Sequence, residues 1–501
     1  MNHVVNSLNN PQEWSKRIGR MFQEIIQEVE QVRETFSVTG AEYNRDNLLA
    51  YLALRKHNIS DFQLSLAEQG LAAIEKSFCH VLYSLEKILS HLHVEVNLPT
   101  TLVIPTPSDS RGIMKNRSEE LLGKGNNHLD STIMVTLDGK MANNQPLISE
   151  LLLKGMDIAR INCAHDDHEV WKQLIEGVRM AEYRLRDTGY YHDRTCKIYM
   201  DLAGPKVRIG KLPLEDIVVK KGDSLRLLLD SNKLGHPASA DAPAGVPVTL
   251  EKAFRNVRIH DRIFIDDGKI SGIVRHVTKE HIEIEVQTPE GKAYRIKEGK
   301  GLNLPDSLLS LNVPALTEND INDLAFISKY ADILGVSFVH SPLDLKKLRA
   351  ELSKYEVPHL GVVAKIETKD AVHHLARIIL DGLQFERFGI MIARGDLAVE
   401  VGPENLSFVQ EEVLAICSAA YVPVILATGV LERLTKKGIP SRSEMTDVFL
   451  ARRANCIMLN KGTYILNALD MLTKVLISDE AERLTSNESK RNLTDQYGVL
   501  R

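Results

Sequence analysis

The sequence predicts an α/β protein built on a (β/α)8 TIM barrel, with an inserted all-β lid domain and an N-terminal helical domain. Eight short apolar, β-branched segments recur along the chain, and helical patterns lie between most of them. These segments end in polar or charged residues, as barrel strands do where they build an active site. One long connection instead alternates with the period of half-buried strands. The expected barrel strands are Thr132–Leu137, Asp157–Asn162, Lys197–Leu202, Ile333–Phe338, Leu360–Ile366, Phe388–Ala393, Val422–Thr428 and Asn455–Asn460.

The rest of the chain differs from the barrel in composition. Apolar residues at helical spacing follow Pro11, which predicts a small helical domain at the N-terminus. A cap packed on the catalytic domain is the simplest role for it, although a docking or oligomerisation module would show the same pattern. The expected regions are a helical domain (1–96), a linker rich in proline, glycine, serine and asparagine (97–130), the barrel (131–206 and 303–478), the lid (207–302) and a charged tail (479–501).

The overall composition is that of an ordinary globular enzyme, with 44% hydrophobic and 26% charged residues among 501. The net charge of -5 at pH 7 gives no reason to expect nucleic acid as a partner. No segment approaches the roughly 18 apolar residues of a membrane span, so no membrane association is expected. The five cysteines are scattered and no signal peptide precedes them, which favours a reduced, cytoplasmic protein.

The fifth and sixth expected strands carry the clearest chemical signal. The fifth leads into Lys365 and Glu367, and the sixth leads into Gly395 and Asp396. Two carboxylates at neighbouring strand ends can share one hard divalent cation, with the lysine beside it. Gly395 lets backbone N–H groups approach an anion where the next helix begins. Satisfied salt bridges would explain either strand alone, but two such strands one βα unit apart favour a binding site.

Polar residues also follow the other expected strands. Arg160 and Asn162 end the second strand, Asp201 ends the third, and Thr428 ends the seventh. Since the carboxyl ends of barrel strands meet on one face, these side chains should converge there. Cations, a carboxylate pair and a glycine-led anion site together indicate phosphoryl transfer. The sequence lacks the Walker motif and the protein-kinase H-R-D and D-F-G motifs, which excludes those routes to nucleotide binding.

A series of motifs at these positions resembles the pyruvate kinase family. Their order and spacing cover about residues 132–475, which correspond to the family's barrel and inserted lid. The resemblance implies a glycolytic phosphotransferase that moves the phosphoryl group of phosphoenolpyruvate to ADP, giving pyruvate and ATP. The motifs are A-R-I-N-C-A-H (Ala159–His165), M-D-L-A-G-P-K-V-R (Met200–Arg208), F-I-D-D-G-K-I (Phe264–Ile270), K-G-L-N-L-P (Lys300–Pro305), A-K-I-E (Ala364–Glu367), I-A-R-G-D-L-A-V-E (Ile392–Glu400), A-T-G-V-L-E (Ala427–Glu432), S-R-S-E (Ser441–Glu444) and C-I-M-L-N-K-G (Cys456–Gly462).

The resemblance also implies roles for individual residues. Glu367 and Asp396 would hold Mg²⁺ or Mn²⁺, and Lys365 would stabilise the phosphoryl group in transfer. Arg160 would bind phosphate, and Thr428 would lie beside the enolpyruvate, near the proton delivered to its methylene carbon. The other implied contacts are the backbone N–H groups of Gly395 and Asp396 for the substrate carboxylate, and the side chains of Arg160, His165, Arg208 and Lys300 for the nucleotide.

The sequence departs from the family pattern beside these positions. Asn162 and Asp201 match residues that help bind a monovalent cation in the common form of the family. Ala164 stands where the family usually has a serine, and Lys206 stands where it usually has a glutamate. A lysine ammonium that replaces K⁺ would explain both changes, so we expect that K⁺ is not required.

Other departures concern the nucleotide and the end of the chain. The family's glutamine after the seventh strand is Gly429, and its S-G-E-T motif becomes Asn460–Thr463, which leaves nucleotide choice and the final protonation open. The residues after about Leu476 form a charged tail where the family's C-terminal effector domain would follow. Regulation by sugar phosphates at that domain is therefore not expected.

Two further functions are compatible with parts of this pattern. A related barrel could catalyse another reaction of phosphoenolpyruvate or pyruvate, such as carbon–carbon lysis, or the chain could be a non-catalytic regulatory relative. Lys300 counts against a lyase, which needs no nucleotide clamp, and the intact Lys365 and Glu367 count against a regulatory protein. A homo-oligomer, either a dimer or a tetramer, is the expected assembly.

Overall fold

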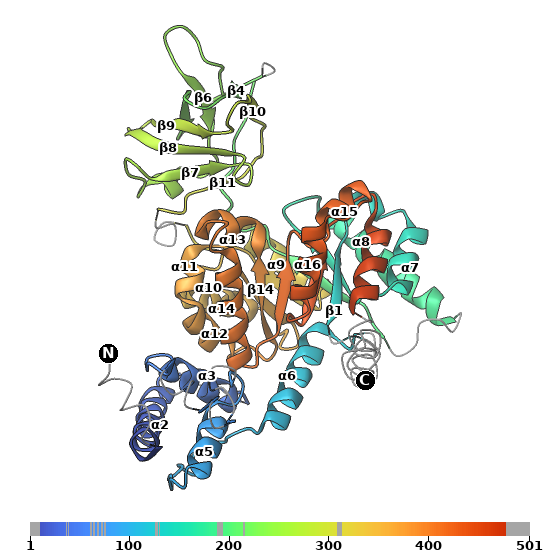
Figure 1. The fold of residues 1–501 in the computed structure, drawn as a ribbon. Coiled ribbons are helices and arrows are strands. Elements are labelled where there is room, and N and C mark those ends of the chain that lie inside the picture. The colour runs from blue at the N-terminus through green and yellow to red at the C-terminus, as the bar shows by residue number, and fades with distance from the viewer. Residues whose placement is uncertain are drawn as a thin grey trace, which may run out of the picture.

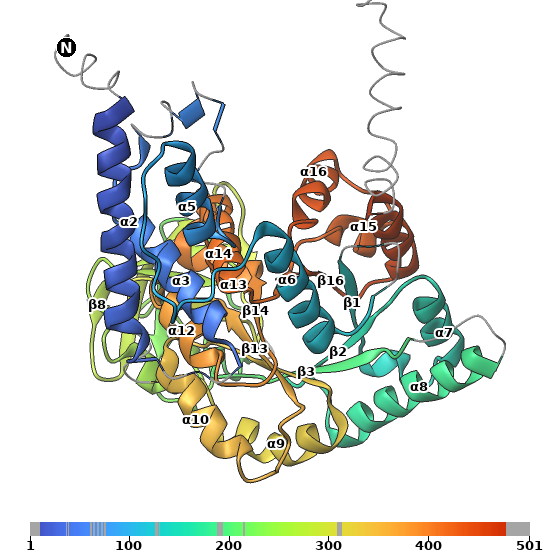
Figure 2. The ribbon, with the colours of Figure 1, turned by 90° about the horizontal axis from the view of Figure 1, so that it is seen from below.

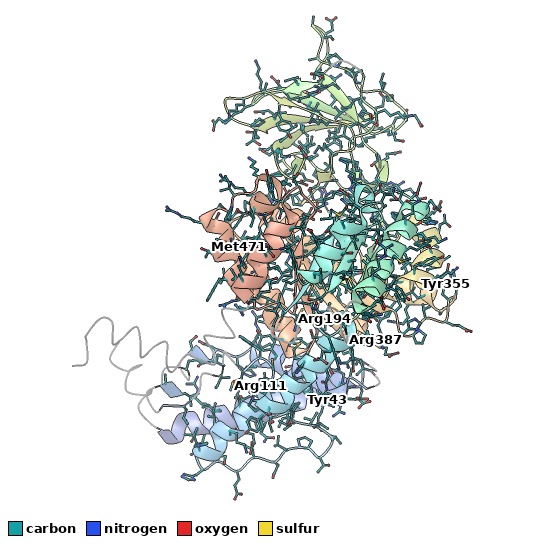
Figure 3. The ribbon with its side chains drawn as sticks, turned by 90° about the vertical axis from the view of Figure 1, so that its right-hand side faces the viewer. Tyr43, Arg111, Arg194, Tyr355, Arg387 and Met471 are labelled. Carbon is teal, nitrogen blue, oxygen red and sulfur yellow. The ribbon has the colours of Figure 1, made fainter. Side chains whose placement is uncertain are left out.

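The computed structural model of the chain describes residues 11–476 except 37, 39, 61, 62, 64, 65, 68, 69, 72, 73, 75, 76, 126–128, 130, 188–193, 214, 215 and 308–312, and only the backbone of residues 11–14. The predicted tail at 479–501 lies outside the described residues. In the side view of Figure 3, Tyr43 and Arg111 lie at the helical end, Tyr355 and Met471 lie on the barrel, and a separate β-sheet stands at the opposite end. None of the described helices is long and apolar enough to cross a membrane.

A closed barrel of eight parallel strands forms the centre of the molecule, which confirms the predicted fold class. Each predicted strand overlaps an observed one, and the ends agree to within two residues. Nearly all strand residues are buried, because side chains fill the barrel inside and helices cover it outside. The strands, in their order around the barrel, are β1 (Thr132–Thr136), β16 (Cys456–Leu459), β15 (Val424–Ala427), β14 (Phe388–Ala393), β13 (Gly361–Ile366), β12 (Ile333–Val336), β3 (Lys197–Asp201) and β2 (Ile158–Asn162).

Helices cover the outside of this barrel (Figure 1). Four of them begin with a side-chain capping box or a proline in the first turn, the signals that start helices in sequence. The helices are α7 (Gln145–Leu153), α8 (His168–Asp187), α9 (Glu318–Tyr330), α10 (Pro342–Leu352), α11 (Lys369–His373), α12 (Leu375–Gly382), α13 (Arg394–Val401), α14 (Leu406–Ala419), α15 (Glu432–Lys437) and α16 (Arg442–Ala451), with the 3-10 turn η2 (Gly139–Met141) after β1.

The long connection after β3 forms a separate sheet with its own core, the β domain (residues 207–302), which stands above the barrel in Figure 1. In its central strands, buried and partly exposed residues alternate, as the period-two pattern predicts. Its six-stranded sheet has the order β11-β7-β8-β9-β5-β6. The elements are β4 (Val218–Val219), β5 (Ser224–Leu228), β6 (Ala244–Pro247), η3 (Glu251–Phe254), β7 (Arg262–Ile265), β8 (Ile270–Val277), β9 (His281–Thr288), β10 (Tyr294–Arg295) and β11 (Leu302–Asn303).

Among the described residues of the N-terminal region, three helices pack at the other end of the barrel, where Figure 2 views the molecule from below. They are α2 (Pro11–Arg33), α3 (Glu42–Leu54) and α5 (Val81–His91). The sequence predicts that the second helix starts at Asn47, but α3 begins five residues earlier, at Glu42. The side chains of Asn44 and Asn47 donate hydrogen bonds of 2.7 Å to the carbonyls of Ala420 and Ala419, at the end of α14. Two residues typical of turns are thus accommodated in a helix by tertiary partners.

The prediction of a plain linker at 97–130 is wrong for its central part, which forms helix α6 (Pro107–Leu122). Thr106 and Asp109 form a capping box at the start of this helix. At its end, Leu121 is buried against the first residues of β13 and β14, where a Cβ atom on Gly361 or Gly389 would lie 2.6 or 2.4 Å from it. The helix therefore closes the amino end of the barrel. Few of its residues are apolar, which is why helical periodicity is hard to detect in its sequence.

Candidate functional site

A cavity of about 510 Å³ lies at the carboxyl ends of the barrel strands, and the β domain forms part of its wall. Loops of parallel barrels gather functional residues at this end, because every strand points its last side chains toward it. From the β domain, Asp266 and the segment 298–301 line the cavity. The sequence-predicted residues that line it are Arg160, Asn162, His165, Lys206, Arg208, Lys300, Lys365, Glu367, Asp396 and Thr428.

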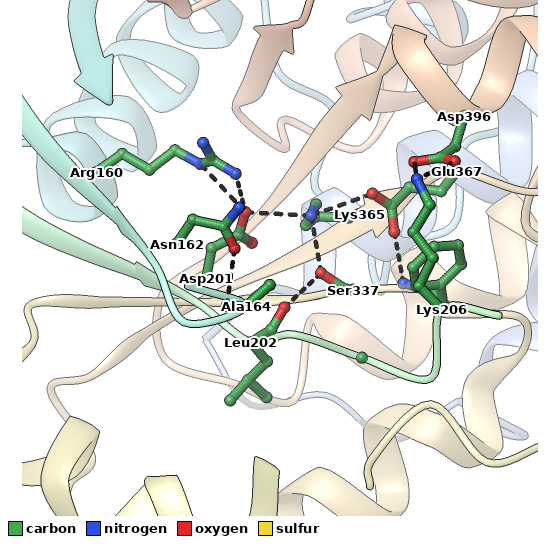
Figure 4. Close-up of polar contacts among 12 residues, drawn as sticks. Arg160, Asn162, Ala164, Asp201, Leu202, Lys206, Ser337, Lys365, Glu367 and Asp396 are labelled. Atoms are coloured by element: carbon green, nitrogen blue, oxygen red, sulfur yellow. Dashed lines mark hydrogen bonds and ion pairs between the residues drawn. The ribbon is translucent and has the colours of Figure 1, made fainter. Parts of the chain in front are cut away.

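Lys365, at the end of β13, is the centre of a buried network of charges (Figure 4). Its Nζ atom lies 3.1 Å from Asp201 Oδ2 and 3.1 Å from Glu367 Oε1, and it donates a hydrogen bond of 2.8 Å to Ser337 Oγ. Burial disfavours the charged ammonium, but the two carboxylates outweigh this effect and raise the pKa of Lys365. The lysine is therefore a permanent positive charge on the cavity wall.

Arg160, at the end of β2, holds the other side of Asp201. Its guanidinium donates from Nε and Nη2 to Asp201 Oδ2 at 3.1 and 2.5 Å, and from Nη1 to Thr136 Oγ1 at 3.0 Å. Burial opposes ionisation of Asp201, yet Lys365 and Arg160 together lower its pKa. Asp201 Oδ1 is buried and has no hydrogen-bond partner within the described part of the chain. Asp201 thus fixes two cations side by side.

Glu367 follows β13 and is almost completely buried. Its Oε2 atom accepts a hydrogen bond of 2.7 Å from the backbone N–H of Phe338, while Oε1 faces Lys365. Burial raises the pKa of Glu367; Lys365 counteracts this, and the negative charge of Asp396 adds to it. Phe338 has a φ of 54°, a left-handed conformation that is unusual outside glycine and collects at functional sites.

Asp396 lies in the first turn of α13, where no side chain caps the helix. The helix start thus presents backbone N–H groups, including that of Gly395, toward the barrel mouth. A Cβ atom at Gly395 would lie 3.0 Å from Thr428 Cγ2, so glycine permits this close approach. Thr428 itself has a φ of 69°, and its carbonyl accepts a hydrogen bond of 2.9 Å from Arg394 Nε.

Glu367 and Asp396 form a donor set that suits a hard divalent cation. Both are carboxylates on one cavity wall, and the negative charge of Asp396 contributes to the raised pKa of Glu367. Mg²⁺ is commonly bound by one or two carboxylates, with substrate oxygens and water completing its shell. Within the described ranges, no cluster of three or more histidine, cysteine, aspartate or glutamate side chains could hold a metal by itself. The residues therefore fit a metal that is shared with a bound anion.

The structure places Lys206 differently from its predicted grouping with Asn162 and Asp201. Its Nζ atom lies 2.7 and 3.0 Å from the two carboxylate oxygens of Asp396. Asn162 Oδ1 instead accepts a hydrogen bond of 3.1 Å from the N–H of Ala164, within its own loop. Asn162 and Asp201 do lie together, as paired residues of β2 and β3. The reason is geometric: the side chain of Lys206 is long enough to reach the carboxylate at α13.

Of the residues predicted to bind a nucleotide, Arg208 and Lys300 belong to the β domain, whereas Arg160 and His165 belong to the barrel. Lys300 Nζ is 2.8 Å from Asp266 Oδ1, and Arg208 donates a hydrogen bond of 3.0 Å to the carbonyl of Gly299. Burial lowers the pKa of His165, and so do the nearby cations, among them Lys461 and Arg208. A second cavity, of about 230 Å³, is also lined by Arg160 and His165 and extends to Asn460 and Lys461.

Several residues of the site escape sequence analysis. Phe338 contributes only its backbone N–H, and no residue type signals that role. Asn303, in β11, donates a hydrogen bond of 3.2 Å from Nδ2 to Asp396 Oδ1, although it is 93 residues away. Burial opposes the ionisation of Asp266, but hydrogen bonds from Lys300 and Tyr294 outweigh this effect and lower its pKa. The F-I-D-D-G-K-I motif contains Asp266 and the K-G-L-N-L-P motif contains Asn303, but neither motif indicates which side chains these residues contact.

Comparisons with known proteins agree with this geometry. The family model described as the barrel domain of pyruvate kinase matches residues 129–468. The pyruvate kinase of Corynebacterium efficiens is 34% identical over 336 residues, which are 66% of this chain and 65% of that protein. The pyruvate kinase of Staphylococcus aureus is 29% identical over 378 residues, 74% of this chain and 60% of that protein. The chain thus spans less than two thirds of the length of these relatives.

Proposed function

The chain belongs to the pyruvate kinase family, and on this premise we propose that it transfers the phosphoryl group of phosphoenolpyruvate to a nucleoside diphosphate, ADP. In this reaction the P–O bond to the enol oxygen breaks, a P–O bond to the terminal phosphate of ADP forms, and the enolate takes up a proton at its methylene carbon to give pyruvate. The observation that carries the proposal is the buried contact of Lys365 with Asp201 and Glu367 beside Asp396.

Glu367 and Asp396 are the proposed ligands of Mg²⁺, or of Mn²⁺ in its place. The bound metal would offset negative charge on the phosphate oxygens and bring the two substrates together. A carboxylate must be deprotonated to accept the metal. Burial raises the pKa of Glu367 and therefore opposes this form. Lys365 favours that deprotonated form through its contact with Oε1.

Lys365 and Arg160 are the proposed cations for the phosphoryl group in transfer. The transition state spreads charge over the equatorial oxygens, and fixed cations stabilise that charge without reorganising. Asp201 holds both side chains, and Thr136 holds the guanidinium in addition. The substrate carboxylate would bind the N–H groups of Gly395 and Asp396, where the start of α13 attracts anions.

Thr428 is the proposed neighbour of the enolpyruvate carbon that becomes protonated. It lines the cavity, and its left-handed backbone orients the end of β15 toward Gly395. The nucleotide would occupy the side lined by Arg160, His165, Arg208 and Lys300. The positive charges of Arg160, Arg208 and Lys300 match the phosphates of a nucleoside diphosphate. Gly429 and Asn460 leave the identity of the base open.

We also propose that K⁺ is not required, because Lys206 brings a fixed positive charge into the cavity in place of the family's glutamate. Its observed partner, Asp396, does not exclude this role, since Asn162, Ala164 and Lys206 line the same cavity. A carbon–carbon lyase is supported less well, because Lys300 of the β domain lines the cavity where a lyase needs no nucleotide clamp.

A cytoplasmic homo-oligomer is the proposed form of the protein. All five cysteines are free thiols, as expected in a reducing compartment. On α14 and α16 the exposed apolar side chains Phe408, Phe449 and Leu450 could bury surface between two copies. An ion pair joins Glu411 of α14 to Arg453, which lies two residues after the end of α16.

A single assay tests the proposed reaction. Pyruvate formation from phosphoenolpyruvate is measured with several nucleoside diphosphates, with K⁺ or Na⁺, for wild type, Lys365→Met and the control Lys347→Met. We expect activity with at least one diphosphate, little difference between K⁺ and Na⁺, and a loss of about a thousandfold only in Lys365→Met. No pyruvate from any diphosphate would contradict the kinase function and favour the lyase or the regulatory relative. Strong activation by K⁺ over Na⁺ would contradict K⁺ independence alone.

A further inference from the structure

The carboxylate of Asp396 is bound from both chain segments that join the β domain to the barrel. Lys206, in the outgoing segment, contacts both carboxylate oxygens at 2.7 and 3.0 Å. Asn303, in the returning segment, donates to Oδ1 at 3.2 Å. The side chains of Lys206 and Asp396 are only 18% and 16% exposed, so solvent screens this ion pair weakly. One carboxylate thus joins the barrel to both ends of the β domain.

The backbone holds the ammonium of Lys206 in this position. The N–H of Leu302 donates a hydrogen bond of 2.8 Å to the carbonyl of Val207, which pairs the two connecting segments. Lys206 reaches Asp396 across Gly301: a Cβ atom on that glycine would lie 2.4 Å from Lys206 Cε. Gly301 therefore provides the space through which the lysine passes. A methyl group there would push the end of the side chain away without changing the charge of the protein.

From this geometry we propose that Lys206 is a built-in competitor of the divalent metal at Asp396. A carboxylate that binds an ammonium through both oxygens cannot present the same electron pairs to a metal ion. The ammonium also repels a metal ion at the same carboxylate, so we expect metal binding to displace Lys206, and the cost of breaking that ion pair weakens metal binding. This inference rests on the proposed function, which assigns Asp396 to the metal.

The displacement also links the metal to the β domain. Lys206 lies immediately before residues 207–302 and Asn303 immediately after them, and both contact the carboxylate. Exchange of the ammonium for a metal changes the contacts of both residues at once. Because coupling is reciprocal, any arrangement of the β domain that withdraws Lys206 from Asp396 must bind the metal more tightly.

The test measures the affinity of the unliganded protein for Mn²⁺, from the electron paramagnetic resonance signal of the free ion. We expect Lys206→Met to bind Mn²⁺ about tenfold more tightly than wild type, since typical coupling factors run from about 5 to 150. Gly301→Ala, which keeps the lysine but displaces its end, should tighten binding in the same direction by a smaller factor. Thermal unfolding checks that each variant is folded.

Two control variants isolate the effect. Lys211→Met removes one positive charge at an exposed site five residues further along, and Gly112→Ala adds a methyl group in open space on α6. Both should bind Mn²⁺ as wild type does. Unchanged or weaker binding in Lys206→Met and Gly301→Ala would overturn the competition while leaving the proposed function intact. If wild type does not bind Mn²⁺ at all, the proposed metal site is wrong, and the competition is overturned with it.

Discussion

At the scale of single residues, the site is a row of alternating charges. Arg160, Asp201, Lys365 and Glu367 follow one another through contacts of 2.5 to 3.1 Å, and all four are buried. Breaking such a row is costly, because removing one member leaves a buried charge without its partner. The same contacts therefore position these side chains and stabilise the folded protein. The effect of a substitution on activity and its effect on stability have to be measured separately.

Arg160→Lys tests whether geometry matters beyond charge. Lysine keeps the positive charge but cannot reach both Asp201 and Thr136, as the guanidinium does with three nitrogens. We expect kcat/KM for phosphoenolpyruvate to fall by about 10- to 100-fold, the equivalent of one charge-assisted hydrogen bond. Steady-state kinetics with the phosphotransfer assay measure this change. Equal kcat/KM values for Arg160→Lys and wild type would show that charge alone is sufficient.

At the scale of secondary-structure elements, two helices complete the barrel at its opposite ends. Helix α13 presents Asp396 at the carboxyl end, and α6 inserts Leu121 at the amino end. Both act through their termini: α13 through its unsatisfied N–H groups, and α6 through its last apolar residues. A short helix is marginal by itself, so each must gain its stability from these contacts.

Glu400, in the last turn of α13, predicts a dependence of stability on pH. Burial raises its pKa to about 7; a hydrogen bond from Asn303 opposes the shift, and Asp396 adds to it. The folded protein therefore holds this proton up to about pH 7, whereas the unfolded chain releases it near the ordinary glutamate pKa of 4.5. Its contribution to stability is complete below about pH 4.5 and is lost as the pH rises through 7.

Urea unfolding at pH 5 and pH 8 compares wild type with Glu400→Gln, which cannot ionise. Between these two pH values, the free energy of unfolding of wild type should fall by up to about 3 kcal/mol more than that of the variant. Parallel changes in the two proteins would show that Glu400 does not titrate in this range.

Leu121→Ala tests how α6 closes the barrel. The leucine side chain fills the space above Gly361 and Gly389, so its removal leaves a cavity at the barrel end. We expect a loss of about 2 to 5 kcal/mol in the free energy of unfolding, as for other buried leucines. Ile113→Ala, on a partly exposed turn of the same helix, is the control and should cost clearly less. A similar loss at both positions would contradict a specific role for the helix end.

At the scale of the whole molecule, the site lies between two bodies. The barrel contributes the residues proposed to bind the phosphoryl group and the metal, whereas the β domain contributes Lys300 and Asp266 to the same cavity. The N-terminal helices lie at the far end of the barrel and contact α14 through Asn44 and Asn47 (Figures 1 and 2). The N-terminal helices thus contact the barrel from one end, and the β domain forms part of the cavity wall at the other.

Lys300→Met tests the division between these two bodies. Because Lys300 belongs to the β domain and faces the nucleotide side, its loss should raise the KM for ADP by about tenfold and leave the KM for phosphoenolpyruvate nearly unchanged. Lys269→Met is the matched control, since Lys269 also pairs with Asp266 but does not line the cavity. Equal effects on both KM values would show that Lys300 supports the structure of the site and has no specific role in nucleotide binding.

The barrel and the convergence of polar residues at its strand ends could be predicted from the amino-acid sequence. Apolar runs separated by helical patterns leave few topologies for burying every strand, and polar residues at the strand ends must then meet on one face. Lys365, Glu367 and Asp396 could be selected for this reason. Contacts between residues far apart in the chain became visible in the three-dimensional structure. The ion pair of Lys206 with Asp396, the hydrogen bond from Asn303 and the insertion of Leu121 depend on three-dimensional proximity, which no local pattern encodes.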